Sequence, residues 1–341
     1  MYDYIIITPL PAFYKVNLYN EISKNKKIYV IFLGETTEEQ RASDFSKIEN
    51  VSFDFIFLNK GHFQQRNKIK SIFNLYKILS TLNYKKIILG GWDLLESWFV
   101  IFTNKVNKNY TALESTIIES DTNGAKALLK KFYLNRIDTV FASGSLHVKL
   151  LEELNYKNNI KVTRGVGLMN KPSFTTKYKK YEKSFLYLGR LEEVKNLLFL
   201  ITIFNELKDY NLTIIGDGSI KKDLQKASSP NIIFLDSIPN KNLGNVFKNY
   251  NIFILPSISE PWGLVVEEAL YFGLPVIVSQ NCGSRELIIN NQNGYIIDPT
   301  NINDTKKTIT SINNSQYQKM IKNINHNFIA LKDSEQINVY N

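Results

Sequence analysis

Short runs of apolar, β-prone residues alternate with segments of helical period along the whole chain, and this alternation constrains the fold more than any other feature. It predicts right-handed βαβ units, and therefore parallel sheets covered by helices on both faces. In the first half, the expected strands cover residues 4–8, 28–33, 53–58, 86–89, 110–113 and 139–142. In the second half, they cover residues 185–188, 212–215, 232–235, 252–255, 275–278 and 295–297.

The length of 341 residues is too great for one ordinary core and suits two α/β domains. We expect an N-terminal domain over residues 1–168 and a C-terminal domain over residues 183–315. The polar, basic segment between them, residues 169–182, has no clear apolar period, so we predict a linker there. Weak helical spacing predicts a helical tail over residues 316–341, and packing of this tail against the N-terminal domain is one expectation.

No segment of the sequence has the features of a membrane span or of an export signal. The strongly apolar run at residues 98–102 is far shorter than the roughly 20 residues that a spanning helix needs. The N-terminus has neither the basic region nor the cleavage site of a secretory signal. Cys282 is the only cysteine, so an internal disulfide is excluded and a packing role is expected for it. We therefore expect a cytoplasmic protein.

The formal net charge is +10, of which residues 1–170 carry +7, from 23 Lys and Arg against 16 Asp and Glu. Such a charge can attract an anionic membrane surface, a lipid-linked diphosphate or nucleic acid, although a general richness in Lys and Asn explains it equally well. A helix is expected over residues 67–82, and its apolar face either packs on the sheet or attaches the protein to a membrane. That face comprises Ile69, Ile72, Phe73, Tyr76 and Leu79, and the basic residues around it include Arg66, Lys68, Lys70 and Lys77.

The densest chemical signal is the segment PSISEPWGLVVEEAL at residues 256–270, which is typical of a strand–loop–helix turn. A helix that begins near Gly263 would offer free N–H groups to a diphosphate. Glu260 and Glu268 lie eight positions apart and can contact different parts of one long ligand, because carboxylates accept hydrogen bonds from sugar hydroxyls well. Alternatively, Glu260 only complements the helix dipole and Glu268 is a surface charge.

Three further glycine-containing loops follow predicted strands, at residues 188–196, 215–219 and 280–288. Ligands bind at the carboxyl ends of strands in open α/β sheets, so these loops are candidates for a shared site. Arg190 and Lys195 would place two positive charges there, which suits a leaving diphosphate. Each loop taken alone is equally compatible with a plain turn or an exposed, neutralised charge pair.

In this order, the Gly-Arg…Lys-Asn segment, the Gly-Asp-Gly turn and the two glutamates with Pro-Trp-Gly between them resemble the retaining glycosyltransferases of family four. The resemblance implies the GT-B architecture, in which two Rossmann-like parallel-sheet domains face each other across a cleft. It implies that Arg190 and Lys195 bind the leaving diphosphate. It also implies that Glu260 contacts the transferred sugar and that Glu268 holds the ribose. The other implied donor-binding residues are Gly189, Gly216, Ile238, Trp262, Gly263, Leu264 and Val265.

The N-terminal half departs from this family at its expected reaction centre. Many members carry a histidine after the fifth strand, whereas this sequence has Glu114 there, which we expect to be a catalytic or acceptor-side residue. His62 and His147 are expected to be ordinary loop or surface residues. The loop after the first strand resembles a variant of the family's first loop and places Tyr14 and Lys15 on the acceptor side.

The sequence has no Asp-x-Asp motif and no cluster with metal-ligand spacing, so we expect neither a metal nor another cofactor. The resemblance implies transfer of a hexose or N-acetylhexosamine, with retention, from a nucleotide sugar, with UDP favoured over GDP. The implied acceptor is a glycan or a polyprenyl-diphosphate-linked lipid of bacterial lipopolysaccharide, O-antigen or capsule synthesis, used at the inner face of the plasma membrane. The alternatives are a GT-B-like nucleotide-sugar epimerase, a non-catalytic nucleotide-sugar-binding protein and, on charge alone, a nucleic-acid-binding protein, although no nucleic-acid-binding module is recognisable.

Overall fold

The computed structural model describes residues 1–46, 48–173, 179–324 and 327–341. The chain forms two compact units. Unit 1 comprises Met1–Glu39, Ser46–Leu168 and Asp333–Asn341, and unit 2 comprises Gln40–Phe45 and Met169–Lys332. The main division therefore falls where the first predicted domain ends, and residues 174–178 of the predicted linker lie outside the described residues.

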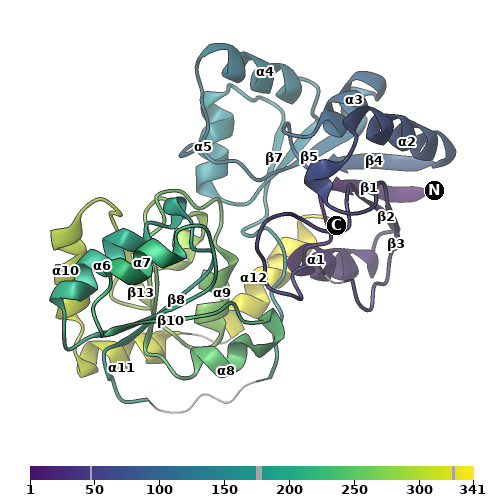
Figure 1. The fold of residues 1–341 in the computed structure, drawn as a ribbon. Coiled ribbons are helices and arrows are strands. Elements are labelled where there is room, and N and C mark those ends of the chain that lie inside the picture. The colour runs from purple at the N-terminus through teal and green to yellow at the C-terminus, as the bar shows by residue number, and fades with distance from the viewer. Residues whose placement is uncertain (47, 174–178, 325–326) are drawn as a thin grey trace. The chain divides into compact units, whose positions relative to one another are not determined.

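Unit 1 contains a seven-stranded, fully parallel sheet in the order β3-β2-β1-β4-β5-β6-β7 (Figure 1). The order reverses between β1 and β4, which is the position where ligands bind in open α/β sheets. The strands are β1 (Tyr2–Thr8), β2 (Ile28–Phe32), β3 (Asp54–Phe57), β4 (Tyr84–Leu89), β5 (Asn109–Leu113), β6 (Thr139–Ala142) and β7 (Asn159–Val162).

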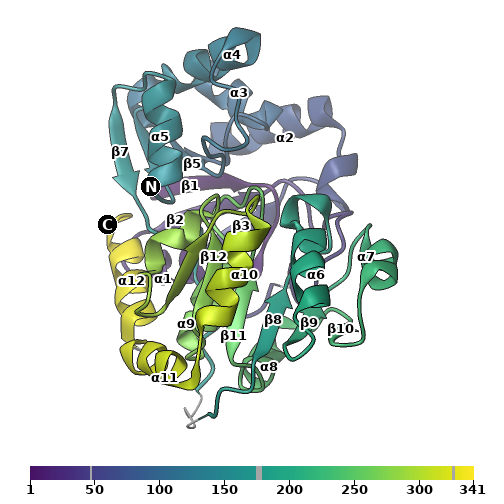
Figure 2. The same cartoon turned by 90° about the vertical axis from the view of Figure 1, so that its left-hand side faces the viewer.

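Helices cover both faces of this sheet, and an apolar core fills each interface (Figures 1 and 2). One face carries α2 (Lys68–Thr81), α3 (Leu95–Thr103), α4 (Gly124–Leu134) and α5 (Ser145–Glu153). The other face carries α1 (Phe13–Ser23) together with Tyr340 from the C-terminal segment.

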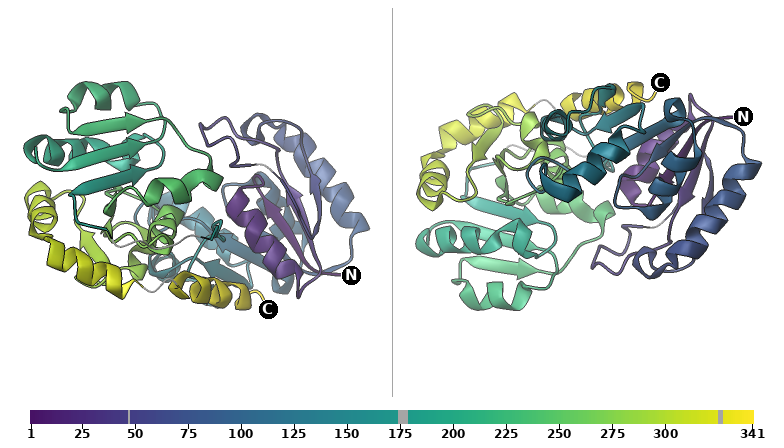
Figure 3. Two further views of the ribbon diagram at one scale, coloured as in Figure 1. Left: turned by 90° about the horizontal axis from the view of Figure 1, so that it is seen from below. Right: turned by 90° about the horizontal axis from the view of Figure 1, so that it is seen from above.

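Unit 2 contains a six-stranded parallel sheet in the order β10-β9-β8-β11-β12-β13, which reverses between β8 and β11 (Figure 2). Figure 3 shows the strands and helices of this unit from two further directions. The strands are β8 (Ser184–Leu188), β9 (Asn211–Ile215), β10 (Ile232–Leu235), β11 (Ile252–Leu255), β12 (Val276–Ser279) and β13 (Gly294–Ile297). Its helices are α6 (Leu197–Glu206), α7 (Lys221–Ala227), α8 (Leu243–Phe247), α9 (Leu264–Tyr271), α10 (Ile302–Ser311) and α11 (Asn314–Asn323). The last helix, α12 (Asn327–Asn338), begins in unit 2 and continues into unit 1.

Aromatic contacts place helices on opposite faces of the second sheet. On β8, Phe185 lies against Phe204 of α6, with ring centroids 5.2 Å apart. On β11, Phe253 lies against Phe247 of α8 at 6.1 Å. Phe253 pairs in register with Leu186, the neighbour of Phe185, and successive residues of a strand point to opposite faces. The α6 and α8 helices therefore cover different faces, as the alternation of elements in the sequence predicts.

All twelve predicted strands are present, with ends shifted by at most two residues. The sequence prediction missed β7, because its side chains are polar or exposed except for the partly buried Ile160. A period-two or continuously apolar pattern is the main strand signal, and an edge strand of this composition carries neither.

Most of the apolar face predicted for the helix over residues 67–82 does not pack on the sheet; of its five residues, Leu79 packs against the core. The α2 helix instead buries Ser71 and Leu75 and leaves Ile69, Phe73 and Tyr76 exposed. The cause is a buried ion pair: Arg66 donates to both carboxylate oxygens of Glu96 on α3, at 2.8 and 2.9 Å. The hydroxyl of Ser71 donates to the same carboxylate at 2.6 Å, so this polar contact decides which side of α2 faces inward. Arg66 is therefore not part of an exposed basic face.

The structure also divides the C-terminal region differently from the predicted boundary at residue 315. That boundary falls inside α11, whose Tyr317 and Met320 are buried in unit 2, and unit 2 continues to Lys332. From Asp333 the chain belongs to unit 1, where the ring of Tyr340 stacks on Phe141 with centroids 4.4 Å apart. Among the described residues, no helix has both the length and the apolar character to cross a membrane.

Candidate active site

Four loops at the carboxyl edge of the unit 2 sheet are joined by backbone hydrogen bonds. Leu191 N donates to Asp217 O at 2.9 Å, which connects the loop after β8 to the loop after β9. Ile258 N donates to Val194 O at 2.9 Å and so connects the β11 loop to the β8 loop. Gly283 N donates to Glu260 O at 3.0 Å, which adds the loop after β12. The expectation that these four loops share one edge is confirmed.

Glycines allow these loops to approach closely. A Cβ atom added to Gly216 would overlap the carbonyl oxygen of Gly189, and one added to Gly283 would overlap that of Pro261. Gly263 has a φ of 87°, a left-handed conformation that favours glycine, and it precedes the first residue of α9. Loop packing and backbone conformation therefore account for the glycine pattern of the sequence without any ligand.

The side chains of Lys195 and Glu260 form an ion pair between two of these loops. Both are largely buried, with side chains 11% and 16% exposed, so solvent screens the pair only weakly. Asn196 fixes the position of Lys195: its backbone is left-handed at φ 58°, and its amide donates to Pro299 O at 2.8 Å. The structure thus brings together the two residues for which the sequence predicts opposite charges at one site.

Arg190 lies in the same loop as Lys195, and its backbone carbonyl accepts a 2.7 Å hydrogen bond from the buried hydroxyl of Tyr187. Burial raises the pKa of Tyr187 well above its usual value, the charge of Glu260 raises it further, and the charge of Arg190 opposes the shift. The charges of Arg190 and Glu260 therefore both act on the same buried hydroxyl.

The α9 helix begins at Leu264, so the first turn after Gly263 has the free N–H groups expected of a helix start. Gly263, Leu264 and Val265 are all partly exposed, as contact with a ligand would require. Glu268 lies one turn further along and is buried. Burial, the neighbouring Glu267 and then Asp44 raise its pKa to about 8.

Trp262 differs from the prediction of a donor contact, because its side chain lies in the core and is only 2% exposed. The indole N–H donates to Glu267 at 2.5 Å, and Lys332 of α12 pairs with the same carboxylate at 2.9 Å. Glu267 and Lys332 are fully buried. Trp262 and Lys332 therefore hold the start of α9 from inside the unit, and the side chain of Trp262 has no surface to offer a ligand.

Ile238 is partly exposed in the loop between β10 and α8, where the resemblance places the nucleobase. The contact of Asp44 with this loop was not predicted from the sequence. The Asp44 carboxylate accepts hydrogen bonds from the backbone and side chain of Asn240, at 3.0 and 2.8 Å, and from Lys241 N at 3.2 Å. Asp44 lies in a polar segment without periodicity, so no pattern could have assigned it to unit 2.

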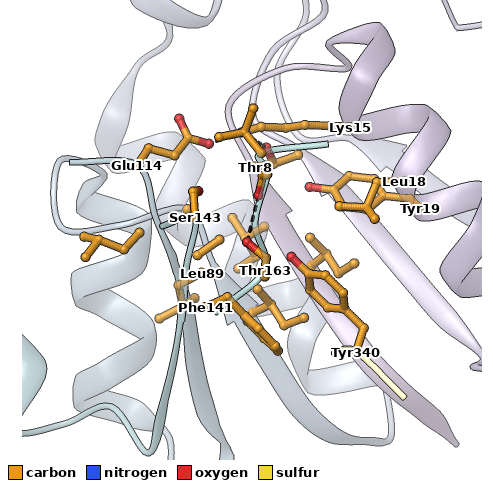
Figure 4. A pocket seen from close by; sticks show the side chains of 18 residues that line it. Thr8, Lys15, Leu18, Tyr19, Leu89, Glu114, Phe141, Ser143, Thr163 and Tyr340 are labelled. Atoms are coloured by element: carbon orange, nitrogen blue, oxygen red, sulfur yellow. Dashed lines mark hydrogen bonds and ion pairs between the residues drawn. The ribbon is translucent and has the colours of Figure 1, made fainter. Parts of the chain in front are cut away.

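Unit 1 has a pocket at the carboxyl ends of β1, β4, β5 and β6 (Figure 4). Lys15 of α1 and Glu114 after β5 form an ion pair at this pocket, so two residues predicted separately lie together. Burial alone would lower the pKa of Lys15, but the charges around it, chiefly that of Glu114, outweigh this and raise it. The Glu114 side chain is 49% exposed. Tyr14 is not among the residues that line the pocket, although Lys15 is.

Two other titratable residues near this pocket differ from expectation or were not predicted. His147, expected at the surface, is fully buried in α5, and burial lowers its pKa to about 4. Asp93, in the loop after β4, has a pKa that burial raises; the charge of Lys130 opposes this shift and that of Glu114 adds to it. Asp93 is thus a second carboxylate within electrostatic reach of Glu114, and its place in the loop that follows a predicted strand was the available sequence signal. The described residues contain no group of three or more His, Cys, Asp or Glu side chains that could hold a metal ion.

Residues 169–327, which contain all four loops of the unit 2 site, match the model of the glycosyl transferases group 1. This part of the chain is similar to the group 1 glycosyl transferases. Sulfoquinovosyl transferase SQD2 of Arabidopsis thaliana is 30% identical to the chain over 123 residues, 35% of this chain and only 24% of that protein. The uncharacterized glycosyltransferase MJ1178 of Methanocaldococcus jannaschii is 25% identical over 80% of this chain and 79% of its own. An uncharacterized 41.2 kDa protein in the cps region of Klebsiella pneumoniae is 24% identical over 71% of this chain and 73% of its own.

Solved structures resemble the chain in fold over nearly its whole length. Sucrose-phosphate synthase from Thermosynechococcus elongatus has a TM-score of 0.72 at 16% identity, covering 100% of this chain and 95% of that one. The apo form of the lipopolysaccharide outer core galactosyltransferase WaaB has a TM-score of 0.69 at 16% identity, covering 98% of each chain. HepE of Anabaena in complex with UDP and glucose has a TM-score of 0.70 at 12% identity, covering 97% of this chain and 95% of that one. These likenesses show that the two parallel-sheet units have the GT-B fold.

Proposed function

We propose that this protein is a glycosyltransferase that moves a hexose or N-acetylhexosamine from a nucleotide sugar to a glycan or lipid-linked acceptor. The observation that carries the proposal is the Lys195–Glu260 pair, set among four joined loops beside the start of α9. A cation, a carboxylate and free N–H groups at one sheet edge suit the two chemically different ends of an activated sugar. The group 1 match over residues 169–327 supports the same assignment.

A uridine nucleotide is the donor that we favour, and a guanosine nucleotide is the second choice. HepE, which resembles the chain in fold, has been solved with UDP and glucose, and this supports a UDP-sugar donor. In our proposal Glu268 accepts hydrogen bonds from the ribose, and the loop that contains Ile238 lies beside the base. Gly189, Gly216 and Gly263–Val265 supply backbone close to the diphosphate and the sugar.

The proposed chemistry breaks the bond between the sugar's anomeric carbon and the diphosphate and forms a bond between that carbon and an acceptor hydroxyl on the same face. The acceptor proton passes to the departing phosphate oxygen, which gives retention of configuration. Lys195 and Arg190 neutralise the negative charge that develops on the leaving diphosphate, so this proposal needs no metal ion. Lys195 exchanges its contact with Glu260 for the phosphate, which frees Glu260 to contact the sugar.

The acceptor side of the reaction is assigned to the pocket of unit 1, where Lys15 and Glu114 meet. A carboxylate that is half exposed can accept a hydrogen bond from an incoming hydroxyl, and Lys15 can hold an anionic acceptor group. The WaaB and cps-region likenesses support an acceptor from lipopolysaccharide or capsule synthesis. Such an acceptor would place the protein at the cytoplasmic face of the plasma membrane.

The test measures nucleotide release from a panel of UDP- and GDP-sugars by the full chain and by Lys195→Ala and Glu260→Gln. We expect each variant to lose about 10²–10³-fold in turnover, the typical effect of removing one group that stabilises developing charge. The matched control is Lys226→Ala, which removes the lysine of an exposed pair with Asp223 in the same unit. It should turn over like the wild type.

The outcomes distinguish the proposal from its alternatives. Wild-type turnover in Lys195→Ala would reject the role of the Lys195–Glu260 pair. Thermal stabilisation by a nucleotide sugar without turnover of any donor or acceptor would indicate a binding protein. Interconversion of the donor sugar without transfer would indicate an epimerase, and salt-sensitive binding to generic oligonucleotides without donor binding would indicate a nucleic-acid partner.

A further inference from the structure

The outer sides of α2, α3 and α4 form one apolar surface on unit 1, which we call the α2–α4 surface. These three helices lie side by side on the same face of the sheet, with α3 between the other two (Figures 1 and 2). Their exposed apolar side chains are between 47% and 82% accessible. They are Ile69, Phe73 and Tyr76 on α2, Leu95 and Phe102 on α3, and Leu128, Leu129 and Phe132 on α4.

This exposure is concentrated rather than scattered. Eight of the nineteen exposed large hydrophobic side chains found among the described residues lie on these three helices. The helices bury a separate set of side chains toward the sheet, including Leu75, Ile101 and Tyr133, so the outer set is not needed for the core. Single exposed apolar residues need no explanation, but a contiguous group usually marks an interaction site.

Ring contacts join the three helices into one surface. Tyr76 of α2 meets Phe99 of α3 edge-on, with centroids 6.3 Å apart. Phe132 of α4 stacks on Trp98 at 6.3 Å and lies 5.8 Å from Phe102, both on α3. Because the aromatic side chains continue across both helix boundaries, one flat partner can contact all three helices.

The exposed charged side chains of the three helices are all lysines, so the helices give the α2–α4 surface positive charge. The only acidic residue in the three helices is Glu96, which is fully buried and paired with Arg66. The lysines on α2 are exposed, at positions 68, 70 and 77, and Lys77 Nζ lies 4.4 Å from the centre of the Phe73 ring. Lysines of this kind can extend their amines past apolar neighbours toward negative charge.

We infer that the α2–α4 surface docks on the anionic surface of a lipid bilayer. Apolar side chains that alternate with lysines along helices lying flat are the composition of an interfacial membrane contact, since the apolar groups enter the acyl boundary while the amines meet lipid phosphates. Each lysine near an anionic leaflet contributes about 1 kcal/mol. A protein partner would require complementary acidic and apolar groups in fixed positions, whereas a bilayer supplies both in any arrangement. This inference does not depend on the donor site of unit 2.

The experiment is co-sedimentation of the full chain with vesicles of phosphatidylcholine containing about 30 mol% phosphatidylglycerol, a typical anionic surface. We expect the wild type to bind, and Ile69→Ser/Phe73→Ser to bind at least about tenfold more weakly, since two apolar anchors are lost. Lys68→Gln/Lys70→Gln should bind less and lose most of its salt dependence. The matched control is Leu198→Ser/Ile289→Ser, which removes two exposed apolar side chains of unit 2 and should bind like the wild type.

Three results would overturn the inference. The first is a wild type that stays in the supernatant with anionic vesicles, and the second is equal binding by the Ile69/Phe73 variant and the wild type. The third is self-association that the Ile69/Phe73 variant abolishes without any vesicle binding, because the surface would then join two copies of the chain. Thermal stabilisation by UDP should be the same in every variant. Failure of vesicle binding with intact UDP binding would therefore leave the proposed donor site standing.

Discussion

Each unit places a Lys–Glu pair at the carboxyl edge of a parallel sheet, but the two carboxylates are in different surroundings. In unit 2, Glu260 is largely buried, and the nearby Glu267 and Glu268 are buried as well. In unit 1, Glu114 is half exposed at a pocket. Buried carboxylates require fixed partners, and unit 2 supplies Lys195 and Lys332. The comparison suggests that the unit 2 site is held rigid by the fold, whereas the unit 1 carboxylate remains available to incoming groups.

The strongest test of this contrast is removal of the deepest partner. Lys332→Met leaves the charge of Glu267 buried without its cation, and we expect it to lower the free energy of unfolding by about 3–5 kcal/mol. Urea denaturation followed by circular dichroism measures the loss. Lys332→Met/Glu267→Leu should regain at least half of it, because both charges are then absent. Lys24→Met, which breaks the exposed Lys24–Glu21 pair of unit 1, should cost less than about 1 kcal/mol. Equal losses in the two single variants would break the contrast.

Backbone packing provides the second test. Gly283→Ala adds a Cβ that would overlap the carbonyl oxygen of Pro261 in the joined loops of unit 2, and we expect a loss of about 3 kcal/mol. Gly61→Ala in unit 1 adds a Cβ with nothing within 4 Å, so only its left-handed conformation, φ 76°, costs energy, about 1 kcal/mol. The same denaturation experiment compares them. If Gly283→Ala unfolded with the same free energy as the wild type, the loops of unit 2 would not be rigidly joined.

The third test uses pH. Because burial, Glu267 and Asp44 raise the pKa of Glu268 from 4.5 to about 8, the folded state favours the protonated carboxyl. The contribution of Glu268 to the free energy of unfolding is complete below pH 4.5. It is lost as the pH rises through about 8, by up to about 1.4 kcal/mol per pH unit. Glu268→Gln should remove this part of the pH dependence, whereas Glu206→Gln, in an exposed pair with Lys306, should retain it. Identical pH profiles for Glu268→Gln and the wild type would contradict the buried state of Glu268.

The smallest effect on stability is expected at the exposed carboxylate. Glu114→Gln should lower the free energy of unfolding by only about 1 kcal/mol, because solvent screens half of the Glu114 side chain, although the largely buried Lys15 then loses its charged partner. If Glu114 meets the acceptor, transfer should fall by more than about tenfold while stabilisation by UDP stays unchanged. Turnover assays measure the transfer, and thermal shifts on the same samples measure the stabilisation by UDP. A matching loss of UDP binding would place the function of Glu114 on the donor side instead.

The sequence was sufficient to predict the sheets and the loops because both depend on local patterns. The strands follow apolar runs, and the four loops follow strands whose carboxyl ends share one edge by topology. The Lys195–Glu260 pair could be expected because each residue lies in a recognisable motif. The edge strand Asn159–Val162 carries no such pattern, and the prediction therefore missed it.

Long-range contacts account for what the sequence did not reveal. The inward side of α2 depends on Arg66 and Ser71 bonding to Glu96, about thirty positions later in the chain. The motif predicts that Trp262 contacts the donor. In the structure, its indole N–H instead donates to the buried carboxylate of Glu267, which also pairs with Lys332. Partners of this kind can be recognised only when the three-dimensional arrangement is known, because neither periodicity nor spacing encodes them.

The position of Tyr340 has a consequence for folding during synthesis on the ribosome. This ring stacks on Phe141, and its backbone carbonyl accepts a 2.9 Å hydrogen bond from the hydroxyl of Tyr4, so residues from the beginning and the end of the sequence complete one apolar layer. Unit 1 is thus interrupted by nearly all of unit 2 in the order of translation. Its α1 face cannot close until residue 340 has emerged, and a nascent chain that stops earlier would expose Phe141 to chaperones and proteases.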